Sequence, residues 1–316
     1  MRKSVLLSVA LLFFWATVAQ AAPWWEDAVV YEIFVRSFND SDGDGIGDFR
    51  GIEAKLDYIE DLGATAIWLM PSFATTTYHG YDIVDYYAVN QEYGSMEDFE
   101  GLLKAARSRG IRVILDLVLN HSSSENEWFE RSVARDPEYD DWYIWRDEPM
   151  PGRWMVYGAD ELVEGGGWRY SEERGQYYYA YFVPRMPDFN ILNPAVREEL
   201  KEVARFWLDK GVSGFRLDAA QNIVEHGPGQ DLQKDSPGTV AWWVEFNDAV
   251  KAADPEAMLV GEVWGTRARI GRYHVRGKGL DRCFDFPFGT SIRETLGSRE
   301  TEAFVDAAMS RHDVEA

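Results

Sequence analysis

Strand-like and helix-like segments alternate along most of this chain, and that alternation limits the folds open to it. Residues 29–35, 64–70 and 111–119 are apolar runs of strand length, and helical periodicity at 52–62 and 95–110 follows the first two. The run at 111–119 is almost continuously apolar, as expected for a strand covered on both faces. Repeated strand–helix units predict a parallel α/β sheet, and about six units favour a closed barrel over an open sheet.

The same rhythm returns after residue 190. Asn193 and Pro194 provide a helix N-cap and a first-turn proline, which predict a helix that runs to Lys210. The other elements expected are strands at 214–218, 258–262 and 283–288 and helices at 241–253 and 302–310.

Residues 121–190 interrupt the alternation. This stretch is rich in Trp, Tyr, Gly and acidic residues and has no clean period. Seventy residues are too many for an ordinary loop, so we expect a small inserted subdomain. The predicted organisation is a signal peptide at 1–21, a first barrel part at 22–120, the insertion at 121–190 and a second, incomplete barrel part at 191–316.

The N-terminus has the pattern of an export signal. Arg2 and Lys3 precede an apolar stretch at 5–18, and Ala19–Ala21 offers a small-residue cleavage site. The stretch is short for a membrane span, although an uncleaved anchor is the alternative. We therefore expect a secreted or periplasmic protein with no membrane association after cleavage.

The amino-acid composition limits the classes of molecule that this chain is expected to bind. The formal net charge is −22, which argues against nucleic acid or an anionic membrane as partner and is compatible with a neutral substrate. Aromatic residues make up 15% of the chain, which suits stacking on sugar rings but also the packing of a large core. Cys283 is the only cysteine, so no intramolecular disulfide is possible.

Two carboxylates close apolar strand-like runs, Asp218 at the end of 214–218 and Glu262 at the end of 258–262. Strand ends at one rim of an α/β barrel are where such folds place reacting groups, and a pair of acids there suits glycosidic bond cleavage. Arg216 shares a strand face with Asp218, so we expect it to keep that carboxylate ionised. We expect Trp264 to be an apolar neighbour of Glu262, which has no cation beside it in sequence. The alternative is a structural Arg216–Asp218 ion pair with a solvated Glu262.

Four segments together carry a family resemblance. Asp116–His121, Gly214–Asp218 and Gly261–Trp264 match three signatures in order, and Met186–Asn190 resembles a fourth near the end of the insertion. The chain thereby resembles glycoside hydrolase family 13, the α-amylase family. In motif it is closest to the α-amylases intermediate between oligo-1,6-glucosidases and neopullulanases.

The resemblance implies a (β/α)8 TIM barrel with domain B inserted after strand three. It also implies retaining cleavage of α-glucosidic bonds in starch-like glucans or maltooligosaccharides, with Asp218 as nucleophile and Glu262 as general acid/base. Asp116 belongs to the first signature and is expected to be structural, and Arg216 is expected to contact the substrate site.

The segment Tyr78–Asp82 follows the second predicted strand. By resemblance, Tyr81 stacks on the sugar whose bond is cut and His121 hydrogen-bonds it. His79 stands where exo-acting relatives carry an acid, and therefore points to an endo-acting amylase. The alternative is a turn packed by two tyrosines.

The loop at 40–48 is the segment of the sequence that most strongly predicts a metal-binding site. Acids alternate with glycines there, which lets several oxygens converge on a hard cation such as Ca²⁺. The resemblance covers this loop as a structural cation site, and an acidic solvated turn is the alternative. The candidate ligands are Asp40, Asp42, Asp44, the Ile46 carbonyl and Asp48. A second, less supported calcium site would use Asn120 and Asp188.

The chain departs from the family pattern in three places. Gln221 and Asn222 stand where many α-amylases have Lys-His. The third family acid is not found, because His312-Asp313 does not fit the fourth signature. The sequence stops at Ala316, before the expected strands seven and eight, so we expect a C-terminally truncated chain with little or no turnover on soluble starch. An α-glucosidase or transglucosylase and a non-catalytic glucan-binding remnant remain the alternatives, and oligomeric state is left open.

Overall fold

The computed structural model describes residues 22–225, 227–298 and 305. The predicted signal peptide at 1–21 and His312-Asp313 lie outside those residues, as does the predicted helix at 302–310 apart from Val305. None of the helices within the described ranges is both long and apolar enough to cross a membrane.

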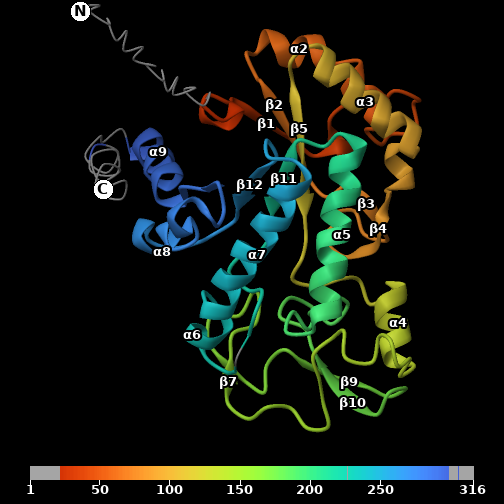
Figure 1. Ribbon diagram of the computed structural model, residues 1–316, viewed down its shortest axis with the longest axis vertical. Helices are drawn as coiled ribbons and strands as arrows, with labels where there is room; N and C mark the ends of the chain where they lie inside the picture. The colour runs from red at the N-terminus through yellow and green to blue at the C-terminus, as the bar shows by residue number, and fades with distance from the viewer. Residues whose placement is uncertain (1–21, 226, 299–304, 306–316) are drawn as a thin grey trace, which may run out of the picture.

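Six parallel strands form the central sheet, in the order β1-β2-β5-β11-β12-β13 (Figure 1). These strands are β1 Val30–Ile33, β2 Ala66–Leu69, β5 Arg112–Leu117, β11 Gly214–Leu217, β12 Met258–Gly261 and β13 Arg282–Cys283. The helices between them are α1 Phe49–Glu53, α2 Leu56–Asp61, α3 Met96–Ser108, α5 Pro194–Lys210, α6 Gln230–Gln233, α7 Pro237–Ala253 and α8 Arg267–Gly271, and α9 Phe286–Ser298 follows the last strand. The predicted parallel α/β architecture is confirmed, and the described sheet corresponds to part of a barrel.

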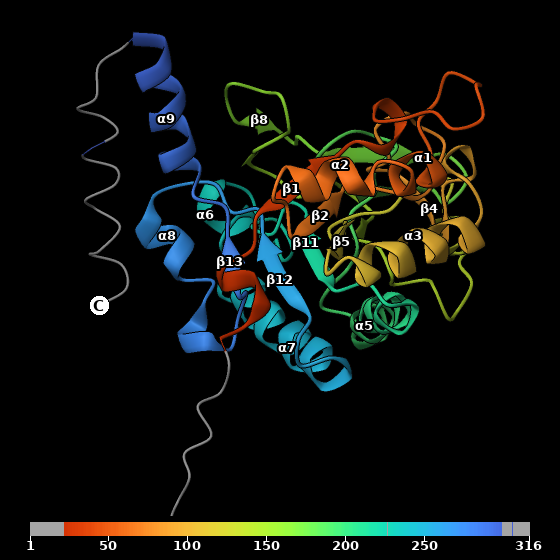
Figure 2. The same ribbon diagram turned by 90° about the horizontal axis from the view of Figure 1, so that it is seen from above.

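The two faces of the sheet have different partners. Along β5, Val113 and Leu115 join the large core cluster formed with the helices, whereas Ile114 and Asp116 point to the opposite face. Figure 2 shows helices α2, α3, α5 and α7 outside the curved row of strands. The central strands β5, β11 and β12 are therefore covered on both sides, which explains their near-continuous apolar sequences, whereas the edge strands β1 and β13 are partly exposed.

The inner face changes from apolar to charged along the strands. Met258 and Val260 of β12 pack with Ile114, and Trp24 and Trp25 lie against this cluster. One strand position further toward the carboxyl ends, the inner face carries ionisable side chains instead. The chain thus closes one end of the half-barrel with apolar side chains and leaves the other end for chemistry.

Several predicted helix boundaries are confirmed. Ser95 and Asp98 form a reciprocal capping box at the start of α3, and Asn193 caps α5 with Pro194 in its first turn. The predicted helix at 52–62 is two short helices, α1 and α2, which meet at residues 54–55.

The predicted strand at 283–288 is wrong beyond its first residue. Strand β13 ends at Cys283, and α9 begins at Phe286. The Asp285 side chain accepts a hydrogen bond from the Phe288 N–H at 3.0 Å, and Pro287 lies in the first turn. A capping acid followed by a first-turn proline starts a helix, and this outweighs the aromatic run that favoured a strand.

Residues 121–190 form a separate set of small elements between β5 and α5. They comprise α4 Glu127–Val133, β6 Trp145–Arg146, β7 Arg153–Trp154, β8 Val163–Glu164, β9 Trp168–Ser171 and β10 Gln176–Tyr179. Part of this segment has its own aromatic cluster, centred on Trp154, Trp168, Tyr179 and Tyr181. Figure 1 shows α4, β9 and β10 at the end of the molecule opposite α2. An antiparallel pair that was not predicted, β3 Phe73–Thr75 and β4 Ile83–Val89, lies between β2 and α3.

Candidate active site

Asp218 and Glu262 lie directly after adjacent parallel strands, β11 and β12. The sheet hydrogen bonds continue through both residues, because the Asp218 N–H donates to the Leu117 carbonyl at 3.1 Å and the Glu262 N–H to the Leu217 carbonyl at 3.0 Å. The backbone of each acid is therefore fixed by the sheet. The two side chains meet at one rim, as their strand-end positions predicted.

Arg216 joins three carboxylates. Its Nη1 lies 2.9 Å from Asp116 Oδ1 and 2.5 Å from Asp218 Oδ1, and its Nη2 lies 2.9 Å from Glu262 Oε2. Arg216 is 5% exposed and Asp116 is fully buried, so water does not screen these contacts. The predicted pairing with Asp218 is present. Glu262 also has this cation beside it, contrary to expectation, because strand neighbours are invisible in the local sequence.

Burial outweighs the arginine at Asp218. Burial is the largest influence on this carboxyl, and its pKa rises to about 8 although Arg216 opposes the shift. Burial likewise raises the pKa of Asp116 to about 6. The expectation that Arg216 keeps Asp218 ionised at neutral pH is therefore wrong for this cluster. Two buried acids, Asp116 and Asp218, and the partly exposed Glu262 share one cation, so burial and mutual repulsion oppose full ionisation of the three carboxyls.

Glu262 is held by hydrogen-bond donors rather than shielded by an apolar ring. The Ala219 N–H donates to Oε2 at 3.1 Å, and the Trp264 indole N–H donates to Oε1 at 3.0 Å. The Trp264 ring is more than half exposed and stacks on Phe286 of α9 at 3.6 Å between ring centroids. The predicted apolar role of Trp264 is therefore wrong, because its polar edge faces the carboxylate.

Gln221 connects the ends of β11 and β12. Its side-chain oxygen accepts from the Trp264 N–H, and its amide group donates to the Trp264 carbonyl, both at 2.8 Å. The amide also donates to Asp235 at 3.0 Å. Where many α-amylases place a lysine, this chain thus has a buried amide that fixes the backbone next to Glu262. Ala219, with φ +44°, makes the tight turn that aims its N–H at Glu262.

The three predicted sugar-binding residues lie together around the loop between β3 and β4. The Tyr81 hydroxyl donates to Asp116 Oδ2 at 3.3 Å, and the His79 and Tyr81 rings stack at 6.1 Å. His121 is buried, and its ring nitrogens lie 3.0 Å from Asn120 Oδ1 and 3.1 Å from the Tyr81 carbonyl. Burial lowers the pKa of His121 to about 4, so its imidazole is neutral at physiological pH.

A cavity of about 470 Å³ opens above these groups. It contains the predicted residues Tyr81, His79, His121, Arg216, Asp218 and Glu262. The inserted segment supplies a second wall that the sequence analysis did not assign to the site, namely Tyr157, Phe182, Val183 and Met186. Met186 begins the recognised Met186–Asn190 motif, and the aromatic content of 121–190 was the only other signal. A pocket with an apolar wall and a carboxylate floor suits a neutral polyhydroxylated ring.

The acidic loop brings together part of its predicted ligand set. Carboxylate oxygens of Asp40, Asp42 and Asp48 lie within 4.8 Å of one another, whereas Asp44 is not in this group and accepts the Ile46 N–H at 2.7 Å. Hydrogen bonds from the Gly43 and Gly45 N–H groups lower the pKa of Asp40. Three ionised oxygens at this spacing match the donor chemistry of Ca²⁺.

The two residues predicted for a second cation site lie together, and Glu225, which was not predicted, joins them. The Asn120 amide lies 3.4 Å from Asp188 Oδ2 and also contacts the Asn222 carbonyl. Burial raises the pKa of Asp188 and of Glu225 well above their ordinary values. Asp188 raises the pKa of Glu225 further, whereas the hydrogen bond from Glu225 lowers the pKa of Asp188. A pair of buried acids binds either protons or a cation. Nothing in the local sequence marked Glu225, because it meets Asp188 only through the fold.

Fold and site together define a class, the barrel glycosidases that carry paired acids on neighbouring strand ends. Residues 32–314 match the family model described as the catalytic domain of α-amylase. The chain belongs to the α-amylase family, glycoside hydrolase family 13, as its motifs indicated.

Known proteins agree with this assignment. The chain is 42% identical to α-amylase 3 of Dictyoglomus thermophilum over 90% of its own length and 52% of that protein. It is 40% identical to a glucan 1,6-α-glucosidase of Streptococcus pneumoniae over 84% of its length and 48% of that protein. The crystal structure of trehalose-6-phosphate hydrolase from Bacillus licheniformis matches with a TM-score of 0.78 and 39% identity, over 84% of this chain and 50% of that one. The chain spans about half the length of the curated relatives it matches.

Proposed function

We propose that this chain carries the retaining machinery for α-glucosidic bond cleavage, with Asp218 as nucleophile and Glu262 as general acid/base. One observation carries the proposal: a single guanidinium contacts both carboxylates, at 2.5 Å and 2.9 Å, on the floor of the cavity. Because both acids bind terminal nitrogens of Arg216, they lie side by side. Retaining glycosidases require closely spaced acids, whereas inverting enzymes need a gap wide enough for water.

The reaction proceeds in two balanced steps. Asp218 attacks the anomeric carbon, the glycosidic C–O bond breaks, and Glu262 gives its proton to the departing oxygen. Water then attacks the same carbon, Glu262 takes the water proton, and the bond to Asp218 breaks. The raised pKa of Asp218 supports a cluster that holds a proton near neutral pH. The first step needs one proton donor and one ionised nucleophile, and the proposal assigns these roles to Glu262 and Asp218.

The proposed substrates are neutral α-linked glucans or maltooligosaccharides. The net charge of −22 and the aromatic cavity wall favour a neutral sugar over an anionic one. His79 at the cavity supports endo-action, because a carboxylate for gripping a terminal sugar is replaced by an imidazole. The relatives are named for different linkages, so maltotriose and isomaltotriose provide the two arms that decide between α-1,4 and α-1,6 preference.

Covalent trapping tests the proposal without requiring repeated turnover. Purified chain is incubated with a 5-fluoro-α-glucosyl fluoride, whose fluoride leaves as the sugar transfers to the nucleophile. Mass spectrometry should show one fluoroglucosyl group on the peptide that contains Asp218, and Asp218→Asn should show none. Oligosaccharide binding without any labelling would reduce the chain to a glucan-binding protein. Hydrolysis of soluble starch, measured in parallel, checks the expectation of little turnover, since the described residues do not include the third family acid.

We also propose that the acidic loop binds a structural Ca²⁺. The convergence of carboxylate oxygens of Asp40, Asp42 and Asp48 supports it. When bound, the ion would neutralise like charges and fix the loop that leads into α1, whose N-cap is Asp48. Asn120 and Asp188, with Glu225, are the weaker second candidate.

Export is a further proposal, supported by the basic start and the apolar run at 5–18. Expression of the natural chain in a bacterial host, followed by N-terminal sequencing of the released protein, tests it. A mature N-terminus at Ala22 is expected. A protein that keeps residues 1–21 and stays with the membrane fraction would support the uncleaved anchor instead.

A further inference from the structure

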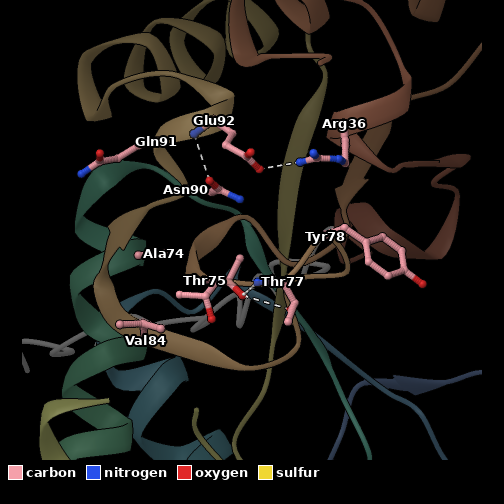
Figure 3. Close-up of a pocket in the computed structure, with 10 residues that line it drawn as sticks. Arg36, Ala74, Thr75, Thr77, Tyr78, Val84, Asn90, Gln91 and Glu92 are labelled. Atoms are coloured by element: carbon pink, nitrogen blue, oxygen red, sulfur yellow. Dashed lines mark hydrogen bonds and ion pairs between the residues drawn. The ribbon is translucent and has the colours of Figure 1, made fainter. Parts of the chain in front are cut away.

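Asp235 is a buried acid between helices α6 and α7, and it is not part of the lining of the catalytic cavity. Its side chain is 7% exposed, whereas Glu92, which pairs with Arg36 in the cavity shown in Figure 3, is 49% exposed. Water therefore screens the Arg36–Glu92 pair far more than it screens the contacts of Asp235. An acid this deeply buried needs hydrogen bonds or a cation, so its partners indicate its role.

The carboxylate of Asp235 joins segments that follow both catalytic strands. Its Oδ1 accepts hydrogen bonds from the Tyr273 hydroxyl at 2.6 Å and from the Gln221 amide at 3.0 Å. Its Oδ2 lies 3.3 Å from Arg269 Nε. Gln221 belongs to the segment after β11, whereas Arg269 and Tyr273 belong to the segment after β12. Asp235 thus connects the exits of the two strands that end at the proposed catalytic acids.

The backbone holds Asp235 in one orientation. Its N–H donates to the Gln221 carbonyl at 3.0 Å, and its carbonyl accepts from the Arg272 guanidinium at 3.0 Å. Its φ of +56° lies in the left-handed region, at a cost that the surrounding contacts must offset. Burial raises the pKa of Tyr273, and Asp235 raises it further, so this hydroxyl keeps its proton and acts as the donor. The carboxylate is therefore fixed before any substrate binds.

A chain of contacts leads from Asp235 to Glu262. The Gln221 amide that donates to Asp235 also binds both main-chain groups of Trp264, at 2.8 Å each. The Trp264 indole in turn donates to Glu262 Oε1 at 3.0 Å. The other oxygen, Oε2, is held separately, 2.9 Å from Arg216 Nη2. Oε1 therefore takes its direction from Trp264, and Trp264 is fixed by the amide that Asp235 orients.

We propose that Asp235 is a positioning residue for Glu262, the proposed general acid/base. Acting through Gln221 and Trp264, it holds Glu262 Oε1 where the proton is transferred. This inference rests on the proposed function and adds to it a residue outside the cavity lining. Proton transfer requires donor and acceptor within hydrogen-bond reach, so displacement of Oε1 slows the steps that need Glu262 and spares those that do not.

The release of a trapped sugar isolates a step that needs a base. The whole chain is labelled to completion with the 5-fluoro-α-glucosyl fluoride, and mass spectrometry follows the loss of label from Asp218 with and without sodium azide. Water must give a proton to Glu262 as it attacks the anomeric carbon and the bond to Asp218 breaks. Azide attacks the same carbon as an anion and leaves as a glycosyl azide, so it needs no base. The ratio of the two rates therefore reports on Glu262 rather than on the overall fold.

Removal of the Asp235 carboxylate should make release depend on azide. In Asp235→Ala, release by water should slow about tenfold, as expected for loss of a hydrogen bond that orients a charged group, and azide should restore most of the rate. Asp235→Asn keeps an oxygen for Tyr273 and Gln221 and suits the left-handed backbone, so its release should stay within about twofold of wild type. Glu262→Gln, the reference for a lost base, should depend on azide most strongly.

Asp281→Ala is the matched control. The Asp281 side chain is 15% exposed, lies 2.8 Å from Lys251 Nζ and accepts the Leu259 N–H near the amino end of β12, away from Glu262. This variant should lower the melting temperature, as Asp235→Ala does, and keep the wild-type ratio of release with and without azide. If Asp235→Ala does not fold, Tyr273→Phe decides, because it removes one donor to Asp235 and should slow release by water about threefold, with rescue by azide.

The outcomes separate this inference from the proposed function. Equal slowing of release by water and by azide in Asp235→Ala overturns the inference, because the residue then supports the fold as a whole. A wild-type ratio in Asp235→Ala, or in Tyr273→Phe where it takes that variant's place, also overturns it. Absence of label on wild-type Asp218, or release from Glu262→Gln that azide does not accelerate, contradicts the proposed function and the inference with it.

Discussion

Two groups of carboxylates in this molecule have opposite electrostatic settings. Asp116 and Asp218 are buried around a buried arginine, and burial raises their pKa values to about 6 and about 8. Asp40, in the loop that precedes α1, is fully exposed, and backbone N–H groups lower its pKa. Burial at the sheet rim thus favours the protonated form of an aspartate, whereas the glycine-rich loop favours the ionised form.

The difference shows how the chain separates two uses of aspartate. Glycines at 43 and 45 allow a turn whose N–H groups converge on one carboxylate, so water and dipoles stabilise the charge. The rim of the sheet provides neither water nor free N–H groups for Asp116, and a single guanidinium must balance several acids. A loop that stabilises ionised carboxylates suits the binding of a cation. A sheet rim that favours protonated carboxyls suits proton transfer.

Removal of the buried arginine should give the largest effect. Arg216→Met leaves two buried acids and the partly exposed Glu262 without a cation, and should lower the free energy of unfolding by about 3–5 kcal/mol at pH 8. The loss should shrink toward pH 5, because protonation of the acids removes the uncompensated charge. Thermal unfolding at both pH values measures this. Arg205→Met breaks only exposed ion pairs on α5 and should cost less than about 1 kcal/mol; equal losses in the two variants would contradict the picture.

Calcium should stabilise the fold by binding the exposed carboxylates of the acidic loop, and not the buried carboxylates around Arg216. At a free concentration of one hundred times the dissociation constant, a single site adds about 2.7 kcal/mol to the free energy of unfolding. Melting in calcium and in EGTA measures the difference. Asp42→Asn should abolish the response, while Asp57→Asn, an exposed acid on α2, should keep it. Asp44→Asn distinguishes the ligand sets: a retained response supports the three-residue group, and a lost response supports the five-residue set. A response unchanged in Asp42→Asn would exclude this loop.

Neutralisation of the nucleophile should stabilise the fold in a pH-dependent way. The folded pKa of Asp218 is about 8, above the ordinary value of 3.8, so the native state binds more protons and stability falls as pH rises between these values. Asp218→Asn should therefore raise the free energy of unfolding at pH 8 and have little effect near pH 4. Denaturant unfolding across this pH range measures it. A larger gain at pH 4 than at pH 8 would reverse the sign and refute the raised pKa.

The smallest effect is expected at the indole that faces Glu262. Trp264→Phe keeps the stack on Phe286 but removes the donor to Oε1, and loss of one hydrogen bond to a charged group should slow sugar transfer about tenfold. The rate of labelling by the fluoroglucosyl reagent measures this, and Trp264→Leu shows the added cost of losing the stack. Identical rates for wild type and Trp264→Phe would remove the hydrogen bond from the mechanism.

The local sequence pattern was sufficient to predict the strands and the acidic residues at their ends. Alternating faces in β5, β11 and β12 place Asp116, Asp218 and Glu262 at one rim, and a strand's two-residue period is readable from sequence. The same reasoning failed for residues 283–288, where Asp285 and Pro287 start a helix within an aromatic run that looks extended.

Contacts between distant segments were beyond the sequence. The pairing of Glu225 with Asp188 and the aromatic wall at Tyr157 and Phe182 depend on how the inserted segment and the sheet meet. The balance at Asp218 failed for another reason. Parity places Arg216 beside it, but the extent of burial that overcomes this cation is a property of the whole fold.

The paired hydrogen bonds of Gln221 have a stereochemical consequence. With the Ala219 contact to Glu262, they tie the exits of β11 and β12 into one unit, so the two acids cannot drift apart. Carboxylate separation decides whether a sugar leaves with the anomeric configuration it brought or with the opposite one. The anomeric configuration of the product would therefore depend on a buried glutamine that is not part of the cavity lining.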